Sequence, residues 1–72
     1  MTPLRLSLRA ARVNAGLTQE SLATRIGVSK TTINSWESGK TSPDLKHLRM
    51  VCEITGIPMD YIFLPDTLPK VN

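Results

Sequence analysis

The chain is poor in cysteine, with one among its 72 residues. One cysteine cannot form an internal disulfide framework, so we expect the fold to be held by a hydrophobic core. Long apolar runs are also missing, and no segment approaches the ~18 residues of a membrane-spanning helix. The first residues lack the apolar segment of a signal peptide. We therefore expect no contact with a membrane and a location in the reducing cytoplasm.

Residue types that carry chemistry are scarce as well. His47 and Cys52 are the only histidine and cysteine of the chain. On one predicted helix they would lie about 140° apart around the axis, so they cannot share a site. No further histidine or cysteine completes a zinc tetrahedron, and the chain has neither a carboxylate pair in an apolar setting nor a glycine-rich phosphate loop. We expect no enzymatic activity, no metal site and no cofactor.

Charge is present, with a mild excess of one sign. Nine lysines and arginines against six acids give a net charge of +3 and an isoelectric point near 9.5. A mildly basic surface suits a polyanionic partner without proving one. The length allows one small domain, and such a chain buries only about 60% of its unfolded surface. Pairing with a second copy would therefore help to stabilise it.

The segment Thr18–Gly39 predicts two short helices joined by a tight turn. The first helix has one apolar face, made by three residues at helical spacing: Leu22, Ala23 and Ile26. Gly27 interrupts this pattern, and glycine tolerates the positive φ that a sharp helix end requires. Ser29 is a good N-cap for the second helix.

The second helix of this segment has a core side and a polar side. Ile33 and Trp36 face the core, although a lone tryptophan is alternatively a stacking platform for a single-stranded base. The opposite face is polar throughout: Lys30, Thr31, Asn34, Ser35 and Ser38. Short polar side chains with one lysine, set at an angle by a glycine turn, suit the major groove of double-stranded DNA.

Together with its flanks, this segment resembles a known family. The matching positions are Ala23, Gly27, Val28, Ile33 and Trp36, and the matching flanks are Gly16–Glu20, Trp36–Lys40, Ser42–Pro43 and Gly56–Ile62. They are similar to those of phage repressors, Cro proteins and the xenobiotic-response-element group of transcriptional regulators. The resemblance covers Leu4–Leu64. It implies an all-α, compact five-helix bundle of the lambda-repressor-like kind, with the helix-turn-helix in helices 2 and 3. Residues 1–64 would form this domain, followed by a tail of residues 65–72.

The first helix is expected to begin at Thr2-Pro3, where proline suits the first helical position. Its inward stripe comprises Leu4, Leu8, Ala11 and Ala15. Beside it runs a second apolar stripe of Leu6, Ala10 and Val13. This second stripe is either buried within the domain or docks the C-terminal tail or another chain.

Two further helices are expected after the helix-turn-helix. Ser42 would cap the fourth helix, with Pro43 at its first position. Its core stripe comprises Leu45, Leu48, Val51 and Cys52. Pro58 would start the last helix, which has the sequence PMDYIFL.

Arg12 falls on the inward side of the first helix, where a charge is unusual. A buried guanidinium needs a carboxylate partner, because its desolvation alone is costly. In the family that the chain resembles, the matching arginine pairs with the glutamate that stands at Glu37. The resemblance therefore implies a partly buried Arg12–Glu37 ion pair that joins the first helix to the recognition helix.

The recognition helix, Ser29–Ser38, would carry any sequence readout, since its N-terminal turns reach base edges in such proteins. The predicted base-contacting residues are Lys30, Thr31, Asn34 and Ser35. The predicted phosphate-contacting residues are Thr18, Gln19, Ser29, Thr32, Lys40 and Thr41. The role of Gln19 is implied by the resemblance, because the matching glutamine of the family holds a DNA phosphate and braces the recognition helix.

These features predict a sequence-specific regulator of transcription, with repression as the simplest outcome. Two copies would read a near-palindromic operator in double-stranded DNA, and the predicted dimer interface comprises Pro58, Met59, Ile62 and Phe63. The same fold also serves as an antitoxin whose main partner is a toxin protein, or as the controller of restriction–modification genes. A domain that binds only proteins would have little use for the polar set of Gln19, Lys30, Asn34 and Lys40.

Overall fold

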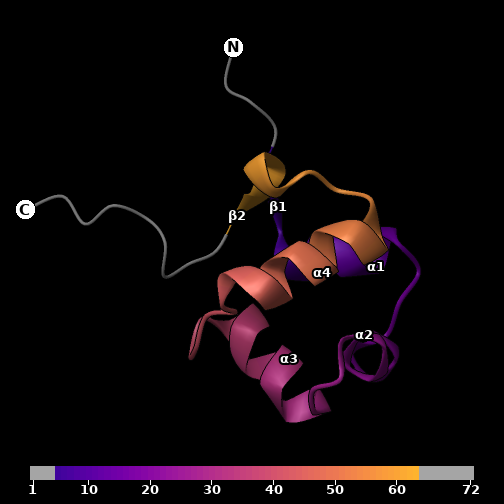
Figure 1. The fold of residues 1–72 in the computed structure, drawn as a ribbon, viewed down its shortest axis with the longest axis vertical. Coiled ribbons are helices and arrows are strands. Elements are labelled where there is room, and N and C mark those ends of the chain that lie inside the picture. Colours follow the sequence, from indigo (N-terminus) through magenta and orange to yellow (C-terminus); the bar gives the residue numbers. More distant parts are fainter. Residues whose placement is uncertain (1–4, 64–72) are drawn as a thin grey trace, which may run out of the picture.

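The computed structural model describes residues 5–63, which form a small, mostly helical domain (Figure 1). Its elements, in chain order, are β1 (Leu6–Ser7), α1 (Leu8–Asn14), α2 (Gln19–Ile26), α3 (Lys30–Ser38), α4 (Leu45–Thr55), the 3₁₀ turn η1 (Met59–Tyr61) and β2 (Ile62–Phe63). Figure 1 shows α2 and α3 at one end of the domain and the two short strands at the other.

The core draws one fully buried aliphatic side chain from each of the four helices: Leu8, Leu22, Ile33 and Val51. Each such burial stabilises the fold by about 1.5–3 kcal/mol, so the core depends on all four helices being in place. Trp36 is only 5% exposed and belongs to the same cluster. The core interpretation of Trp36 is therefore correct, because a buried indole offers no platform for a base.

The turn between α2 and α3 has the local chemistry that the sequence predicts. Gly27 ends α2 with φ at 88°, a left-handed conformation that costs other residues strain. Two residues later the Ser29 hydroxyl accepts a hydrogen bond from the Thr32 amide at 3.1 Å and caps α3. One glycine and one cap therefore set the angle between the two helices.

The first helix is shorter than predicted. It begins at Leu8, after Ser7, whose hydroxyl accepts a hydrogen bond from the Ala10 amide at 3.0 Å. Leu6 and Ser7 are instead a strand that pairs in parallel with β2, in the register Leu6 to Ile62. At Leu6 and Ser7 the main chain pairs with β2 instead of forming helical hydrogen bonds. The Ser7 side chain favours this, because it caps the start of α1, which follows directly.

This strand changes the two apolar stripes expected on the first helix. Leu6 meets the C-terminal segment as a strand residue, while Val13 is 56% exposed. Ala15 is the C-cap and is exposed instead of lying inward. Leu8 and Ala11 remain on the buried face. The predicted start at Thr2-Pro3 and the residue Leu4 lie outside the described residues.

The prediction of a fifth helix is also wrong, since the described residues contain four α-helices. After Pro58 the chain makes one 3₁₀ turn and then extends into β2. Ile62 and Phe63 are of the β-branched and aromatic types that favour strands, and β1 supplies the partner. The predicted helix therefore ends after one turn, while Leu64 and the tail lie outside the described residues.

The fourth helix starts two residues later than predicted. Its N-cap is Asp44 and not Ser42, and Oδ1 of Asp44 accepts a hydrogen bond from the His47 amide at 2.9 Å. Leu45 is then the first helical residue and lies about 120° around the axis from Val51. It is 58% exposed, so its predicted place in the core stripe is wrong. Leu48 and Cys52 are half-buried.

Candidate nucleic-acid interface

The outer face of α3 presents the polar residues that the sequence singled out. Lys30, Thr31 and Asn34 are exposed there, while Ser35 is half-buried. Ile33 and Trp36 hold the opposite face in the core. The helix is thus fixed on its apolar side and free on its polar side, which is the arrangement required for insertion into a groove.

An open hollow of about 740 Å³ lies between α1, the start of α2 and α3. It is lined by Arg9, Arg12, Leu17, Thr18, Gln19, Glu20, Lys30, Asn34, Glu37 and Ser38. Four of the predicted DNA-contacting residues meet here: Thr18, Gln19, Lys30 and Asn34. The other predicted contacts do not line the hollow: Thr31 and Ser35 on α3, Ser29 and Thr32 at its start, and Lys40 and Thr41 in the loop behind it.

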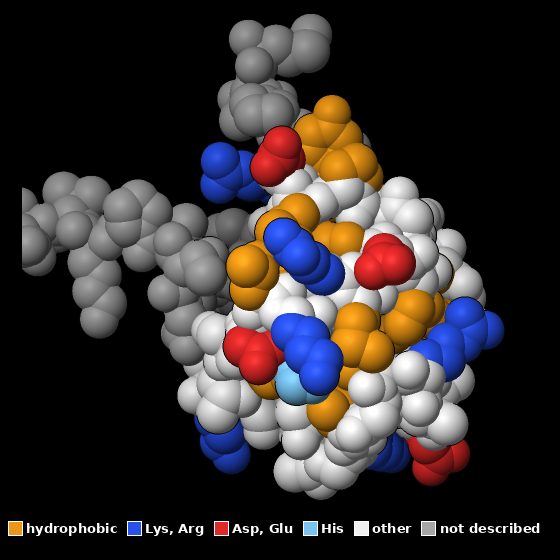
Figure 2. Space-filling model, in the orientation of Figure 1, with side chains coloured by type: hydrophobic (Ala, Val, Ile, Leu, Met, Phe, Trp, Pro, Cys, Tyr) orange, Lys and Arg blue, Asp and Glu red, His pale blue; other side chains and the backbone are white. Residues whose placement is uncertain are grey.

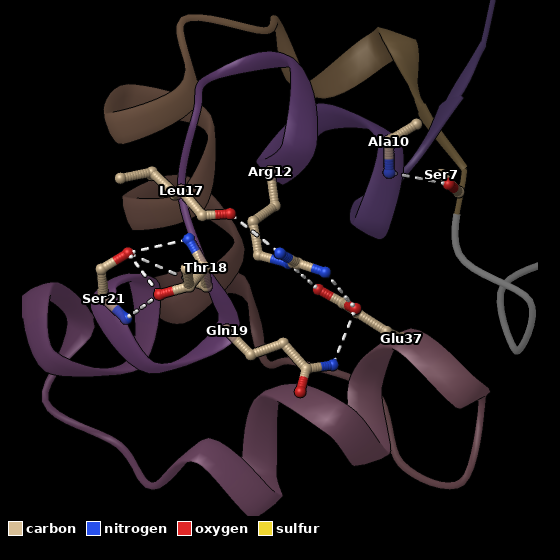
Figure 3. Close-up of polar contacts among 8 residues, drawn as sticks. All are labelled: Ser7, Ala10, Arg12, Leu17, Thr18, Gln19, Ser21 and Glu37. Carbon is tan, nitrogen blue, oxygen red and sulfur yellow. Dashed lines mark hydrogen bonds and ion pairs between the residues drawn. The ribbon is translucent and has the colours of Figure 1, made fainter.

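Arg12 and Glu37 form an ion pair at the floor of this hollow (Figure 3). Nε of Arg12 donates to Oε2 of Glu37 at 2.6 Å, and Nη2 donates to Oε1 at 3.2 Å. The remaining arm, Nη1, donates to the Leu17 carbonyl oxygen at 2.8 Å. The two side chains are 10% and 5% exposed, so a paired, bidentate geometry is what makes their burial tolerable. Through these bonds α1 holds the C-terminal part of α3.

Gln19 connects the start of α2 to the same carboxylate, as Figure 3 shows. Its amide nitrogen donates to Oε1 of Glu37 at 3.0 Å, and a carboxylate accepts only, so the nitrogen must face it. The second N–H of this amide has no partner among the described residues. Gln19 can therefore brace α3 and still donate one hydrogen bond outward.

The predicted phosphate contacts at the helix starts are already engaged within the domain. Thr18 and Ser21 form a reciprocal capping box, with the Ser21 amide 3.0 Å from the Thr18 hydroxyl. The Ser29 and Thr32 hydroxyls lie 2.9 Å apart and bond to each other. These side chains position the N-termini of α2 and α3, and the free amides of those helix starts are the groups left to face an anion.

Arg9 is a cation on this surface that the sequence reasoning did not single out. It is exposed on α1 and lines the hollow together with Lys30 and Asn34. The signal that could have found it is its spacing, three residues before Arg12 on one helix, which places both side chains on one side. Arg12 turns inward to Glu37, and Arg9 stays at the rim.

Helix α4 supports the recognition helix from behind. The rings of His47 and Trp36 lie 5.6 Å apart at 44°. The hydrogen bond from the His47 amide holds the pKa of the Asp44 carboxyl below its ordinary value of 3.8, and the His47 ring, 2.7 Å away, adds to this. Figure 2 shows the face that carries this histidine, where basic and acidic side chains alternate with apolar ones. A mixed surface of this kind has no strong field to attract a polyanion.

Other chemistry finds little support in the described part of the chain. Burial raises the pKa of the Cys52 thiol above its ordinary value, which disfavours the reactive thiolate form. Residues 5–63 contain no group of three or more histidine, cysteine, aspartate or glutamate side chains that could hold a metal ion. None of the helices in this range is long and apolar enough to span a membrane.

Comparison with known proteins agrees with this geometry. Residues 8–62 match a family model described as "Helix-turn-helix". The resemblance to phage repressors and related regulators is thereby confirmed, since one similar protein is the cryptic phage CTXphi transcriptional repressor RstR of Vibrio cholerae. That protein is 36% identical over 72% of this chain and 47% of its own length. No solved structure matches the chain.

Two further relatives differ in how much of them the chain covers. An uncharacterized HTH-type transcriptional regulator of Methanocaldococcus jannaschii is 39% identical over 79% of this chain and 86% of its own length. The HTH-type transcriptional activator BcrR of Enterococcus faecalis is 34% identical over 85% of this chain. The chain spans only 30% of that activator.

Proposed function

The chain belongs to the helix-turn-helix family of DNA-binding transcriptional regulators, and from this premise we propose that it is a repressor that binds a near-palindromic operator as a homodimer. The observation that carries the proposal is the hollow beside α3, where Gln19, Lys30 and Asn34 converge. Its polar wall is held rigidly by the Arg12–Glu37 pair.

In this proposal the exposed face of α3 reads bases in the major groove. Lys30 would donate to guanine O6 and N7, and Asn34 would pair with adenine through its amide. Thr31 would offer its hydroxyl or its methyl group, and Ser35 would contact a base or a phosphate. Each true base contact is worth about 1–3 kcal/mol of discrimination against the wrong base.

Phosphate contacts would fix the register of the protein on the duplex. The second N–H of Gln19 and the first amides of α2, after Thr18, are the first group. Ser29 and Thr32 cap the start of α3, and the first amides of that helix, at Lys30 and Thr31, are the second. Lys40 and Thr41, both exposed after α3, would follow the backbone of the DNA as the third.

Dimerisation would double these contacts. The segment after α4 contains the predicted interface residues. Pro58 is exposed, Met59 and Ile62 are half-buried, and Phe63 lies in β2. Tyr61, beside them, is 50% exposed. Two copies joined through this segment would place their recognition helices in successive major grooves, about 34 Å apart. Occupying a promoter in this way excludes polymerase and represses transcription.

Fluorescence anisotropy with double-stranded DNA from upstream of the gene tests the proposal. We expect the native duplex to bind at least ~10³-fold more tightly than a scrambled one. Asn34→Ala should lose most of this preference, while Lys46→Ala, an exposed change on α4, should keep it. Equal binding of both duplexes would refute sequence-specific recognition. In a reporter carrying the bound duplex, increased transcription on adding the protein would refute repression.

A further inference from the structure

We propose that Arg9 of α1 is a DNA-backbone contact, so that three helices and not two form the binding surface. The inference rests on the proposed function and adds the residue Arg9 and the helix α1 to the proposed binding surface. Arg9 lines the same hollow as Gln19, Lys30 and Asn34, although it comes from a helix outside the helix-turn-helix.

The Arg9 guanidinium is available to bind a group outside the domain. It is exposed, and no hydrogen bond or ion pair engages its side chain among residues 5–63. Arg12, the other guanidinium of the hollow, is fully used by Glu37 and the Leu17 carbonyl. Arg9 is therefore the guanidinium of this hollow that remains able to bind an external group.

The surroundings of Arg9 favour a phosphate as its ligand. Two acids line the hollow: Glu37 is neutralised by Arg12, and Glu20 forms no ion pair with Arg9 among the described residues, so neither holds Arg9 inside the domain. The planar guanidinium matches two phosphate oxygens with two parallel N–H donors. Base edges are reached by the recognition helix, and Arg9 stands on α1 across the hollow from it. Its target is then the backbone beside the groove, which carries no sequence information.

The test compares Arg9→Gln with Arg49→Gln, a matched loss of one exposed arginine on α4. Affinity for the native and the scrambled duplex is measured across a series of salt concentrations, after melting curves have shown both variants to be folded. We expect Arg9→Gln to weaken binding to both duplexes by the same factor. It should also lower the slope of log affinity against log salt by about 1.8 for the dimer, the value of two phosphate contacts, one from each copy. Arg49→Gln should leave the slope unchanged.

The outcomes separate this inference from the proposed function. If Arg9→Gln keeps the wild-type slope while Asn34→Ala loses the operator preference, the Arg9 contact is refuted and the proposed function stands. If Arg9→Gln weakens only the native duplex, Arg9 reads a base and the inference is equally wrong. If the wild-type protein binds both duplexes equally, the proposed function fails, and the slope on scrambled DNA still decides whether Arg9 meets a phosphate.

Discussion

At the scale of single residues, the Arg12–Glu37 pair connects two helices inside the domain, as a contact between core side chains does. It joins α1 to α3, and Gln19 adds a third helix to the same carboxylate. A buried ion pair is weak evidence of net stability, but breaking one leaves a buried charge without a partner. The pair therefore fixes the position of the recognition helix.

We expect Glu37→Gln to lower the free energy of unfolding by about 3 kcal/mol, because the Arg12 guanidinium would stay buried without a counter-charge. Urea unfolding followed by circular dichroism measures this loss. Glu53→Gln, an exposed change on α4, should stay within about 0.5 kcal/mol of the wild type. Equal midpoints for the two variants would show that the pair does not hold the helices together.

The ionisation of Asp44, at the start of α4, makes the stability of the fold depend on pH. Its pKa is lowered in the folded state by the His47 amide hydrogen bond and by the His47 ring, so the carboxylate form stabilises the fold. This contribution is present above the ordinary pKa of 3.8, which applies to the unfolded chain, and is lost as pH falls through the lower folded value. We expect the urea midpoint of Asp44→Asn to lie below that of the wild type at pH 7, and the difference between the two midpoints to shrink as the pH is lowered to 2. A difference that grows on acidification would contradict this assignment.

At the scale of elements, the turn between α2 and α3 depends on one backbone conformation. A Cβ built on Gly27 meets nothing within 4 Å, so the only obstacle to a side chain is the φ of 88°. We expect Gly27→Ala to cost roughly 1–2 kcal/mol and to lower the melting temperature by several degrees. Gly27→Asn should cost less, because asparagine visits the left-handed region more readily. If alanine and asparagine prove equally tolerated, the turn is not held in this conformation.

The β1–β2 pair shows how a short element can override local preference. Leu6 and Ser7 stand in a region with helical apolar spacing, yet their backbone pairs with Ile62 and Phe63. Pairing of two residues on each strand is weak by itself, and half-buried Ile62 packs on the core and adds to it. The strands thus tie the beginning of the domain to its end.

At the scale of the whole molecule, a domain this small gains from a partner copy. We expect wild-type protein to sediment as a dimer at micromolar concentration and Tyr61→Glu to shift it toward the monomer. Val13→Glu is the matched control, since Val13 is also an exposed apolar residue but lies on α1. A wild-type protein that stays monomeric, or equal weakening by both variants, would argue against an interface at η1.

Much of this molecule could be predicted where the cause is local. Leu22, Ile33 and Val51 follow from helical spacing, and Gly27 and Ser29 mark their turn by their own conformational preferences. The family resemblance supplied the partnership of Arg12 and Glu37, which no spacing along the chain reveals. The spacing of Arg9 from Arg12 places both on one side of α1, but only the structure shows that this side faces the hollow beside α3.

The sequence by itself determined the helix-turn-helix, its polar face and its family, because capping, glycine turns and helical periodicity act over a few residues. The tertiary structure decided that Leu6 is a strand residue, that the segment after Pro58 extends, and that Leu45 faces outward. The first two depend on pairing between segments distant in the chain, and the third depends on the Asp44 cap, which sets where α4 begins. The strand pairing joins residues 6 and 62, which are 56 positions apart, and no preference that acts over a few residues can bring them together.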